Sequence, residues 1–316
     1  MVITLKLSLI VPCFNEAENI NAFQEAVLKT FCDCGYDYEI VFVDDGSTDA
    51  TLHNLHKTFS EQRCPVKAIS FSRNFGKEAA IFAGLHHADG EYIAVIDADL
   101  QQDPKVVYQM VEILDNNTQY DMVAAYQDYR KESKLLTFFK KTFYKLINRL
   151  SDIHLRSDAS DFRTFRRSVA ESIMKLGEYH RFSKGIFAWV GYNTEFIPYT
   201  ACERHAGTSK WNFWKLLNYA IEGIIGYSTA PLRFSVYIGG FTAVAAVLYL
   251  ISVICEKLFL GIDVPGYATI IVLILLLGSI QLFCIGIIGE YVGRTFEQSK
   301  NRPVYIAKEI LTYEEN

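Results

Sequence analysis

Several common signatures are absent from this sequence of 316 residues, and each absence excludes a class of protein. Neither Gly-x-Gly-x-x-Gly nor Gly-x-x-x-x-Gly-Lys-Ser/Thr occurs, which argues against a dinucleotide oxidoreductase and against a P-loop NTPase. The seven cysteines include no Cys-x-x-Cys pair, so we interpret them as reduced thiols. With a net charge of only −5, the chain shows no footprint for nucleic acid, and no nucleic-acid partner is expected. No signal peptide is expected either, because Lys6 interrupts the first apolar run.

Charge is also absent from two long stretches. No charged residue occurs in the 22 residues between Arg233 and Glu256, or in the 26 residues between Asp263 and Glu290. A helix needs about 20 residues to cross the core of a bilayer. We therefore predict a two-helix transmembrane hairpin over residues 231–292. Its spans are expected at about 234–255 and 265–289.

The basic residues near the hairpin predict its orientation. The short loop between the spans has Lys257 as its only basic residue. The opposite ends of the spans carry four, namely Arg233, Arg294, Lys300 and Arg302. Because basic residues favour the cytoplasmic side, we expect both termini, the main domain (1–208) and a C-terminal tail (293–316) in the cytoplasm.

The first part of the chain alternates strands with helices. Apolar runs typical of strands lie at 5–11, 38–43, 66–71 and 91–96, and each leads into a polar turn followed by a helical pattern. This alternation predicts an α/β fold with a doubly wound, mostly parallel sheet. All the polar turns then fall at one edge of the sheet, where nucleotides bind in such folds.

The turn after the fourth run carries Asp97, Asp99 and Gln101. On extended backbone alternate side chains share a face, and two carboxylates with an amide oxygen suit a hard cation such as Mg²⁺ or Mn²⁺. The simpler interpretation is a solvated acidic loop before a helix that begins at Pro104.

Two segments have the pattern of helices that lie on a membrane surface. Residues 134–150 place aromatic and aliphatic residues beside a basic face, which also fits an ordinary helix packed on the sheet. Residues 209–230 combine Trp211, Trp214 and Tyr219 with lysines just before the first span. Since Trp and Tyr favour the membrane interface, we predict an interfacial helix there.

Six short motifs together resemble a known family. They are Val11-Pro12-Cys13-Phe14-Asn15-Glu16, Val43-Asp44-Asp45-Gly46-Ser47, Ser72-Arg73-Asn74-Phe75-Gly76-Lys77, Asp97-Ala98-Asp99-Leu100-Gln101, Asp161-Phe162-Arg163 and Arg181-Phe182-Ser183-Lys184-Gly185. Their order is that of family 2 glycosyltransferases, which have a GT-A-like fold. With the hairpin, the chain resembles the polyprenyl-phosphate members, the GtrB-like bactoprenol glucosyltransferases and dolichol-phosphate mannose synthase. One departure is Gln102-Asp103-Pro104, where Asp-Pro-Pro is commoner.

The resemblance implies a role for individual residues. The nucleotide-sugar would be bound by Pro12, Asn15, Glu16, Asp44, Ser47, Asn74, Lys77 and Asp97. The metal would be held by Asp97, Asp99 and Gln101. The acceptor phosphate would be contacted by Arg130, Arg163 and Lys210. The catalytic residues would be Asp161, Asp99 and Arg204, with Asp161 as base, as orienting group, or simply as a salt-bridge partner of Arg163 or Arg167.

The implied reaction is an inverting transfer of glucose from UDP-glucose to undecaprenyl phosphate at a bacterial plasma membrane, with UDP-N-acetylglucosamine as the alternative donor. The resemblance also implies a homo-oligomer, a tetramer. A processive polysaccharide synthase is disfavoured because no Arg-Trp dipeptide occurs. A non-catalytic membrane scaffold is disfavoured because the Asp97, Asp99 and Gln101 set is intact.

Overall fold

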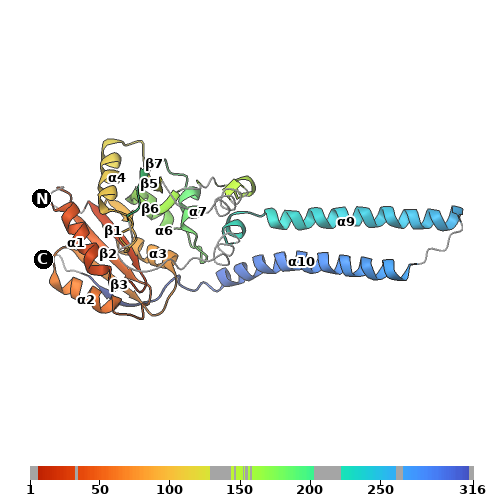
Figure 1. The fold of residues 1–316 in the computed structure, drawn as a ribbon, viewed down its shortest axis with the longest axis horizontal. Helices are drawn as coiled ribbons and strands as arrows, with labels where there is room; N and C mark the ends of the chain where they lie inside the picture. The colour runs from red at the N-terminus through yellow and green to blue at the C-terminus, as the bar shows by residue number, and fades with distance from the viewer. Residues whose placement is uncertain are drawn as a thin grey trace.

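The computed structural model describes residues 6–32, 35–128, 144–145, 147–151, 153, 156, 159–202, 222–260 and 266–312. Within these residues a sheet with helices on both faces forms one body, from which two long helices extend (Figure 1). The segments predicted to lie on the membrane surface, 134–150 and 209–230, fall largely outside the described residues. Of their described parts, residues 144–145, 147–150 and 222–227 are helical.

Eight described strands form a single sheet in the order β7-β5-β6-β4-β1-β2-β3-β8. Their bounds are β1 Leu7–Cys13, β2 Tyr38–Asp44, β3 Val66–Phe71, β4 Tyr92–Val95, β5 Met122–Gln127, β6 Ala159–Arg166, β7 Thr194–Tyr199 and β8 Ala307–Leu311. Strands β1 to β4 pair in parallel, and only β6 and β8 run antiparallel to their neighbours. The prediction of a mostly parallel, GT-A-like α/β sheet is therefore confirmed.

The period-two alternation along β1 explains the two layers of helices. Leu7, Leu9 and Val11 pack in one buried cluster with α1 (Ile20–Phe31) and α4 (Pro104–Asn116). Ile10 points the other way, into a cluster with three further helices. These are α3 (Lys77–His87), α6 (Arg167–Met174) and α7 (Ser183–Trp189). Helix α2 (Thr51–Glu61) covers the β2–β3 end on the α1 side.

The predicted hairpin is present as α9 (Ala230–Cys255) and α10 (Tyr267–Ser299), with a short π-helix, η1 (Glu256–Leu260), after α9. Both are long and apolar enough to cross a membrane, and neither span is buried by the rest of the protein. Helix α10 has 33 residues. At 1.5 Å per residue it is ~50 Å long, so it exceeds a bilayer core of about 30 Å and reaches the α/β body (Figure 1).

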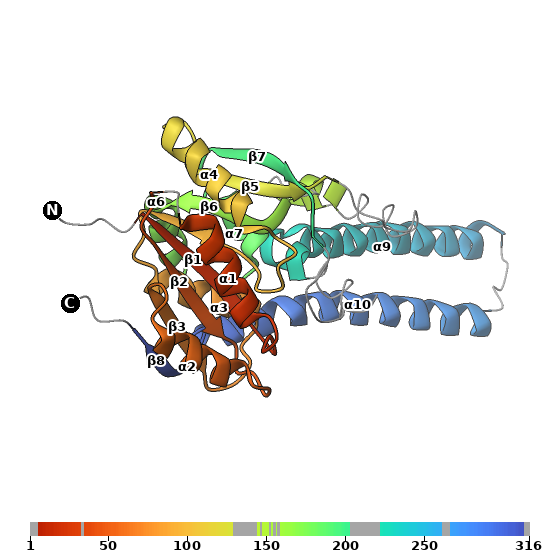
Figure 2. The ribbon, with the colours of Figure 1, turned by 60° about the vertical axis from the view of Figure 1, so that its left-hand side comes forward.

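The segment predicted as a C-terminal tail, 293–316, begins within helix α10. Helix α10 continues to Ser299, and the chain then returns to the sheet as β8, antiparallel to β3 (Figure 2). Just before β8, Tyr305 stacks on Phe71 at 5.0 Å between ring centroids. The physical reason is that β3 would otherwise present an unpaired edge, which β8 satisfies with backbone hydrogen bonds.

Candidate active site

The ends of β1 and β2 hold a network of short polar side chains. Asp44 is buried and accepts hydrogen bonds from the Ser47 amide (3.0 Å) and the Ser70 hydroxyl (2.8 Å). The Ser47 hydroxyl in turn accepts from the Asn15 amide at 2.9 Å. Asn15 has a left-handed backbone (φ 56°), which Asn tolerates, and its Oδ1 accepts from the Thr48 amide. The predicted residues Asn15, Asp44 and Ser47 therefore lie together at one edge of the sheet.

The next residue in this motif, Asp45, fixes the loop that leads into α3. Its carboxylate accepts hydrogen bonds from the backbone amides of Phe75 (2.6 Å) and Gly76 (2.9 Å). Burial raises the pKa of Asp45, although these amides favour its charged form. Gly46 (φ 65°) lies against the same loop, and a Cβ there would come within 2.4 Å of the Arg73 carbonyl carbon. The loop carrying Asn74 and Lys77 is thus tied to the end of β2.

The acidic turn after β4 is held by a residue that the motif analysis did not assign. Gln102 is buried; its Oε1 accepts from the Asp97 amide (2.9 Å), and its Nε2 donates to Asp97 Oδ2 (3.1 Å). Asp99 Oδ1 accepts from the Gln101 amide at 3.1 Å. Between them Leu100 has φ 59°, a conformation that costs free energy in a non-glycine residue and clusters at functional sites.

Lys77, at the start of α3, lies between the acidic turn after β4 and strand β6. Its ammonium lies 2.6 Å from Asp97 Oδ1 and 3.8 Å from Asp161 Oδ2. Burial lowers the pKa of Lys77, but the charges of Asp97 and Asp161 outweigh it and raise the pKa overall. These three predicted residues come from α3, the β4 turn and β6, and the structure brings them together.

The positive charges around Asp161 favour its ionised form. Burial raises its pKa, but the positive charges of Lys77, Lys184 and Arg163 more than offset this, so the pKa lies below its ordinary value. Its Oδ1 is buried and has no hydrogen-bond partner among the described residues. An unsatisfied acceptor at this position is available to a ligand donor.

Glu78, the residue after Lys77, is a second carboxyl near Asp161. It accepts hydrogen bonds from the Ser183 amide (2.9 Å) and from the Ser183 hydroxyl. Burial and the nearby charge of Asp161 raise the pKa of Glu78 to about 7. Glu78 therefore titrates near neutral pH beside Asp161, whose pKa lies below its ordinary value.

Arg163, predicted to contact the acceptor phosphate, is buried. Its side chain is 4% exposed, stacks on the Phe187 ring at 3.9 Å, and donates to the Ser160 carbonyl at 2.7 Å. These contacts hold the guanidinium in the core, and its role toward an acceptor phosphate stays a prediction. The other residues assigned to acceptor phosphate or as a catalytic arginine lie outside the described residues, namely Arg130, Lys210 and Arg204.

The remaining predicted residues surround the same edge. Glu16 donates its amide to the Thr51 hydroxyl and accepts from the Asn19 side chain at 2.6 Å. Pro12 lies near the end of β1, and Asn74 is exposed in the loop before α3. The Gln101 carbonyl accepts a hydrogen bond from the Cys202 amide, which links the acidic turn to the residues just after β7.

The carboxylate oxygens of the acidic turn fit a hard cation whose other ligands are waters and substrate phosphates. Among the described residues no group of three or more His, Cys, Asp or Glu side chains could hold a metal. Asp97 and Asp99 supply two partly exposed carboxylates, and one of them already contacts the Lys77 cation. Mg²⁺ is commonly bound by one or two carboxylates together with waters and substrate phosphates, and this arrangement matches that pattern.

Three residues of the site were missed by sequence reasoning. Gln102 stood out only as a departure from the commoner Asp-Pro-Pro pattern. Asp45 lay within a quoted motif without a role, and Glu78 directly follows another. Their functions depend on contacts with residues 5 to 105 positions away, which no local pattern reveals.

Comparison with known proteins gives matches along nearly the whole chain. The family model for glycosyl transferase family 2 matches residues 8–174, and the model for the GtrB C-terminal hairpin matches residues 230–295. A bactoprenol glucosyl transferase of Shigella phage SfV is 43% identical, over 96% of this chain and 98% of its own. A prophage bactoprenol glucosyl transferase homolog of Escherichia coli K12 is 42% identical, over 97% and 99%.

Among solved structures, glucosyl-3-phosphoglycerate synthase from Mycobacterium tuberculosis, in complex with Mn²⁺, UDP-glucose and phosphoglyceric acid, matches with a TM-score of 0.45. It is 17% identical and covers 70% of this chain and 77% of that chain. Those ligands belong to that enzyme.

Proposed function

The chain belongs to glycosyl transferase family 2, and from this membership we propose that it transfers glucose from UDP-glucose to the phosphate of a polyprenyl lipid. The observation that carries the proposal is the union, on one chain, of an acidic site at the nucleotide edge of the sheet with an apolar two-helix hairpin. The likeness to bactoprenol glucosyl transferases extends through both parts. We place the enzyme in a bacterial plasma membrane with its α/β body on the cytoplasmic side, as the basic residues favour.

The reaction is a displacement at the anomeric carbon of glucose. A phosphate oxygen of the lipid forms the new bond to this carbon, and the bond from the carbon to the diphosphate oxygen breaks, with its electron pair leaving on UDP. The second pKa of a phosphate monoester is about 6, so the nucleophile is already largely a dianion at neutral pH. The lipid phosphate loses one charge and the leaving diphosphate gains one. No proton has to be removed for the bond to form.

Asp161 then acts as an orienting group. Its lowered pKa makes it a weak base, and its buried Oδ1 has no partner among the described residues. A hydroxyl of the sugar is a donor of the right kind for this oxygen. Inversion follows from a single displacement and requires no covalent intermediate on the enzyme.

A divalent cation, Mg²⁺ or Mn²⁺, would be held by Asp97 and Asp99, with Gln101 as a third ligand, and would neutralise charge on the leaving diphosphate. Lys77 now contacts Asp97, and we propose that it turns to the diphosphate when donor binds. Gln102 keeps Asp97 in position through its two hydrogen bonds while this exchange takes place.

The test uses the purified full-length protein with undecaprenyl phosphate and a panel of radiolabelled nucleotide sugars, among them UDP-glucose, UDP-N-acetylglucosamine and UDP-galactose. The expected product is a lipid-extractable, glucose-labelled phosphodiester that forms only with a divalent cation. Asp99→Asn is expected to abolish the product while the melting temperature stays unchanged. Label entering the lipid from another sugar would overturn the donor assignment, and unchanged turnover in Asp99→Asn would overturn the metal assignment.

A further inference from the structure

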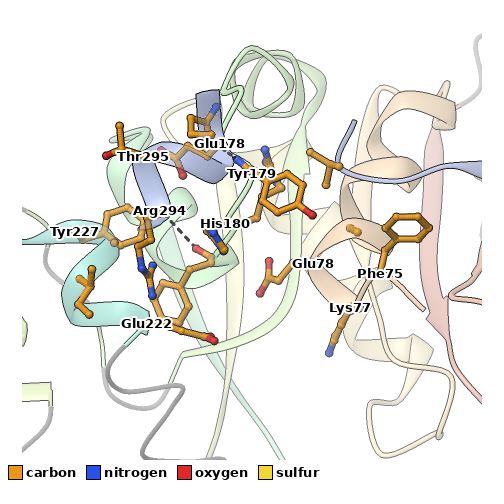
Figure 3. A pocket seen from close by; sticks show the side chains of 18 of the residues that line it. Phe75, Lys77, Glu78, Glu178, Tyr179, His180, Glu222, Tyr227, Arg294 and Thr295 are labelled. Carbon is orange, nitrogen blue, oxygen red and sulfur yellow. Dashed lines mark hydrogen bonds between the residues drawn. The ribbon is translucent and has the colours of Figure 1, made fainter. Parts of the chain in front are cut away.

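A cleft of about 770 Å³ separates the start of α3 from the end of α10 (Figure 3). One wall carries Phe75, Lys77 and Glu78. The facing wall carries Tyr227, Arg294 and other residues of the helical stretch 222–227 and of α10. The 178–182 segment closes the cleft between the walls. None of these facing-wall residues belongs to the donor edge described above.

The cleft joins the acidic site to the membrane side of the molecule. At one end is Lys77, whose ammonium is 2.6 Å from Asp97. At the other end are Tyr291 and Arg294, on the part of α10 that continues directly from the apolar span. Tyr291 donates to the Ser228 carbonyl at 2.6 Å, which fixes α10 against the start of α9 at this level. A headgroup that remains attached to a membrane lipid therefore has a route from α10 toward Lys77.

Arg294 is the arginine that α10 contributes to this cleft. Its side chain is 19% exposed, and its Nε is buried without a hydrogen-bond partner among the described residues. The nearest carboxylate oxygen of the same helix, Glu290 Oε1, is 3.7 Å away. Arg181, by contrast, already donates to the Leu176 carbonyl at 2.9 Å and stacks on Phe82. A guanidinium with a buried, unpaired Nε–H fits an oxyanion ligand such as phosphate.

Among the residues that line the cleft, lysine and arginine side chains outnumber the carboxyl groups: Arg73, Lys77, Arg181 and Arg294 stand against Glu78, Glu178 and Glu222. Burial also raises the pKa of Glu78 to about 7, and it raises the pKa of Glu178.

We propose that this cleft receives the phosphate headgroup of the lipid acceptor and that Arg294 is a phosphate-binding residue of that site. The proposal rests on the proposed function, because it names the place where the acceptor of that reaction binds. It also fills the gap left by Arg163, whose guanidinium lies in the core. The other phosphate within reach of such a site is the diphosphate of the donor, and the experiment separates the two.

The experiment compares wild type with Arg294→Gln in detergent or nanodiscs, with initial rates measured against each substrate in turn. Loss of one charged hydrogen-bonded contact should raise the apparent KM for undecaprenyl phosphate about tenfold or more. The KM for UDP-glucose should stay within about twofold. Arg294→Lys keeps the charge but loses the planar pair of donors, so its KM for undecaprenyl phosphate should lie between those of wild type and Arg294→Gln. An unchanged acceptor KM, or a raised donor KM in its place, overturns the proposal.

Two further measurements separate binding from folding. Arg233→Gln removes an exposed basic residue at the start of α9 that does not line the cleft, and it should leave both KM values unchanged. Geranylgeranyl phosphate should inhibit wild type more strongly than geranylgeraniol, and Arg294→Gln should remove this difference. Persistence of the difference overturns the assignment even if the variant is less stable. If wild type makes no lipid-linked sugar at all, the proposed function fails before any variant is compared.

Discussion

Replacing Glu78 with Gln is expected to stabilise the protein at alkaline pH and to leave its stability at acid pH unchanged. Glu78 is partly buried beside Asp161 and accepts two hydrogen bonds from Ser183. Gln can still accept these hydrogen bonds through its side-chain oxygen, but it cannot ionise. The substitution therefore isolates the cost of holding a negative charge at this position.

The magnitude follows from the shift in pKa. Burial and the Asp161 charge raise the pKa of Glu78 from 4.5 to about 7 in the folded protein. Because the folded state holds the proton more tightly, its contribution to stability is fully present below pH 4.5 and is lost as the pH rises through about 7. At 1.36 kcal/mol per pKa unit, the wild type loses up to about 3 kcal/mol over this window relative to Glu78→Gln.

The assay is thermal unfolding in detergent at a series of pH values between 4 and 8.5, with wild type and variant measured side by side. The difference in melting temperature should be near zero at pH 4, should grow between pH 5 and 7, and should level off above pH 8. Glu18→Gln, which removes an exposed carboxyl, is the matched control and should show no such trend. A difference that stays constant over the whole range would refute the electrostatic account of this site.

Three further substitutions test other contacts. Gln102→Leu removes both hydrogen bonds to Asp97, so it should lower stability by about 1–3 kcal/mol and raise the donor KM; an unchanged donor KM would show that Asp97 needs no such support. Tyr305→Ala removes the ring stacked on Phe71 and should cost ~2 kcal/mol in thermal unfolding, whereas no loss would mean that β8 docks without it. Gly46→Ala places a Cβ against backbone atoms in a left-handed conformation and should cost about 2 kcal/mol, with the yield after detergent extraction and the melting temperature as the readout.

The parts of the fold that sequence could predict are those in which one local pattern fixes the outcome. The apolar runs at 38–43 and 66–71 became β2 and β3 because buried parallel strands need no partner-specific chemistry, only continuous apolar residues between two layers of helices. The two uncharged stretches became α9 and α10 for the same reason, since length and the absence of charge suffice. Asp97 contacts Lys77 at the edge of the sheet because parallel strands end on the same side.

The parts that could not be predicted depend on choices between distant partners. Residues 307–311 have a modest strand pattern, and only the open edge of β3 decides that they join the sheet. Arg163 shares a face of β6 with Asp161, because the two are two residues apart, yet its guanidinium stacks on Phe187 and donates to the Ser160 carbonyl. A motif match transfers the type of a residue but not the direction of its side chain.

The membrane hairpin is part of the site as well as an anchor, because the chain leaving it contacts the start of α3 from two sides. On one side Gln298 of α10 accepts from the Tyr179 amide and donates to the Gly177 carbonyl, and this segment runs on to Ser183, which binds Glu78. On the other side the Ile306 carbonyl accepts from the Ser72 amide, at the loop that leads to Lys77. The first turn of α3, which carries the cation of the donor site and the carboxyl of the cleft, is therefore positioned by residues that follow the second span. A soluble fragment that ends before α10 would lack both supports, so the membrane-spanning segment and the catalytic edge have to be studied as one unit.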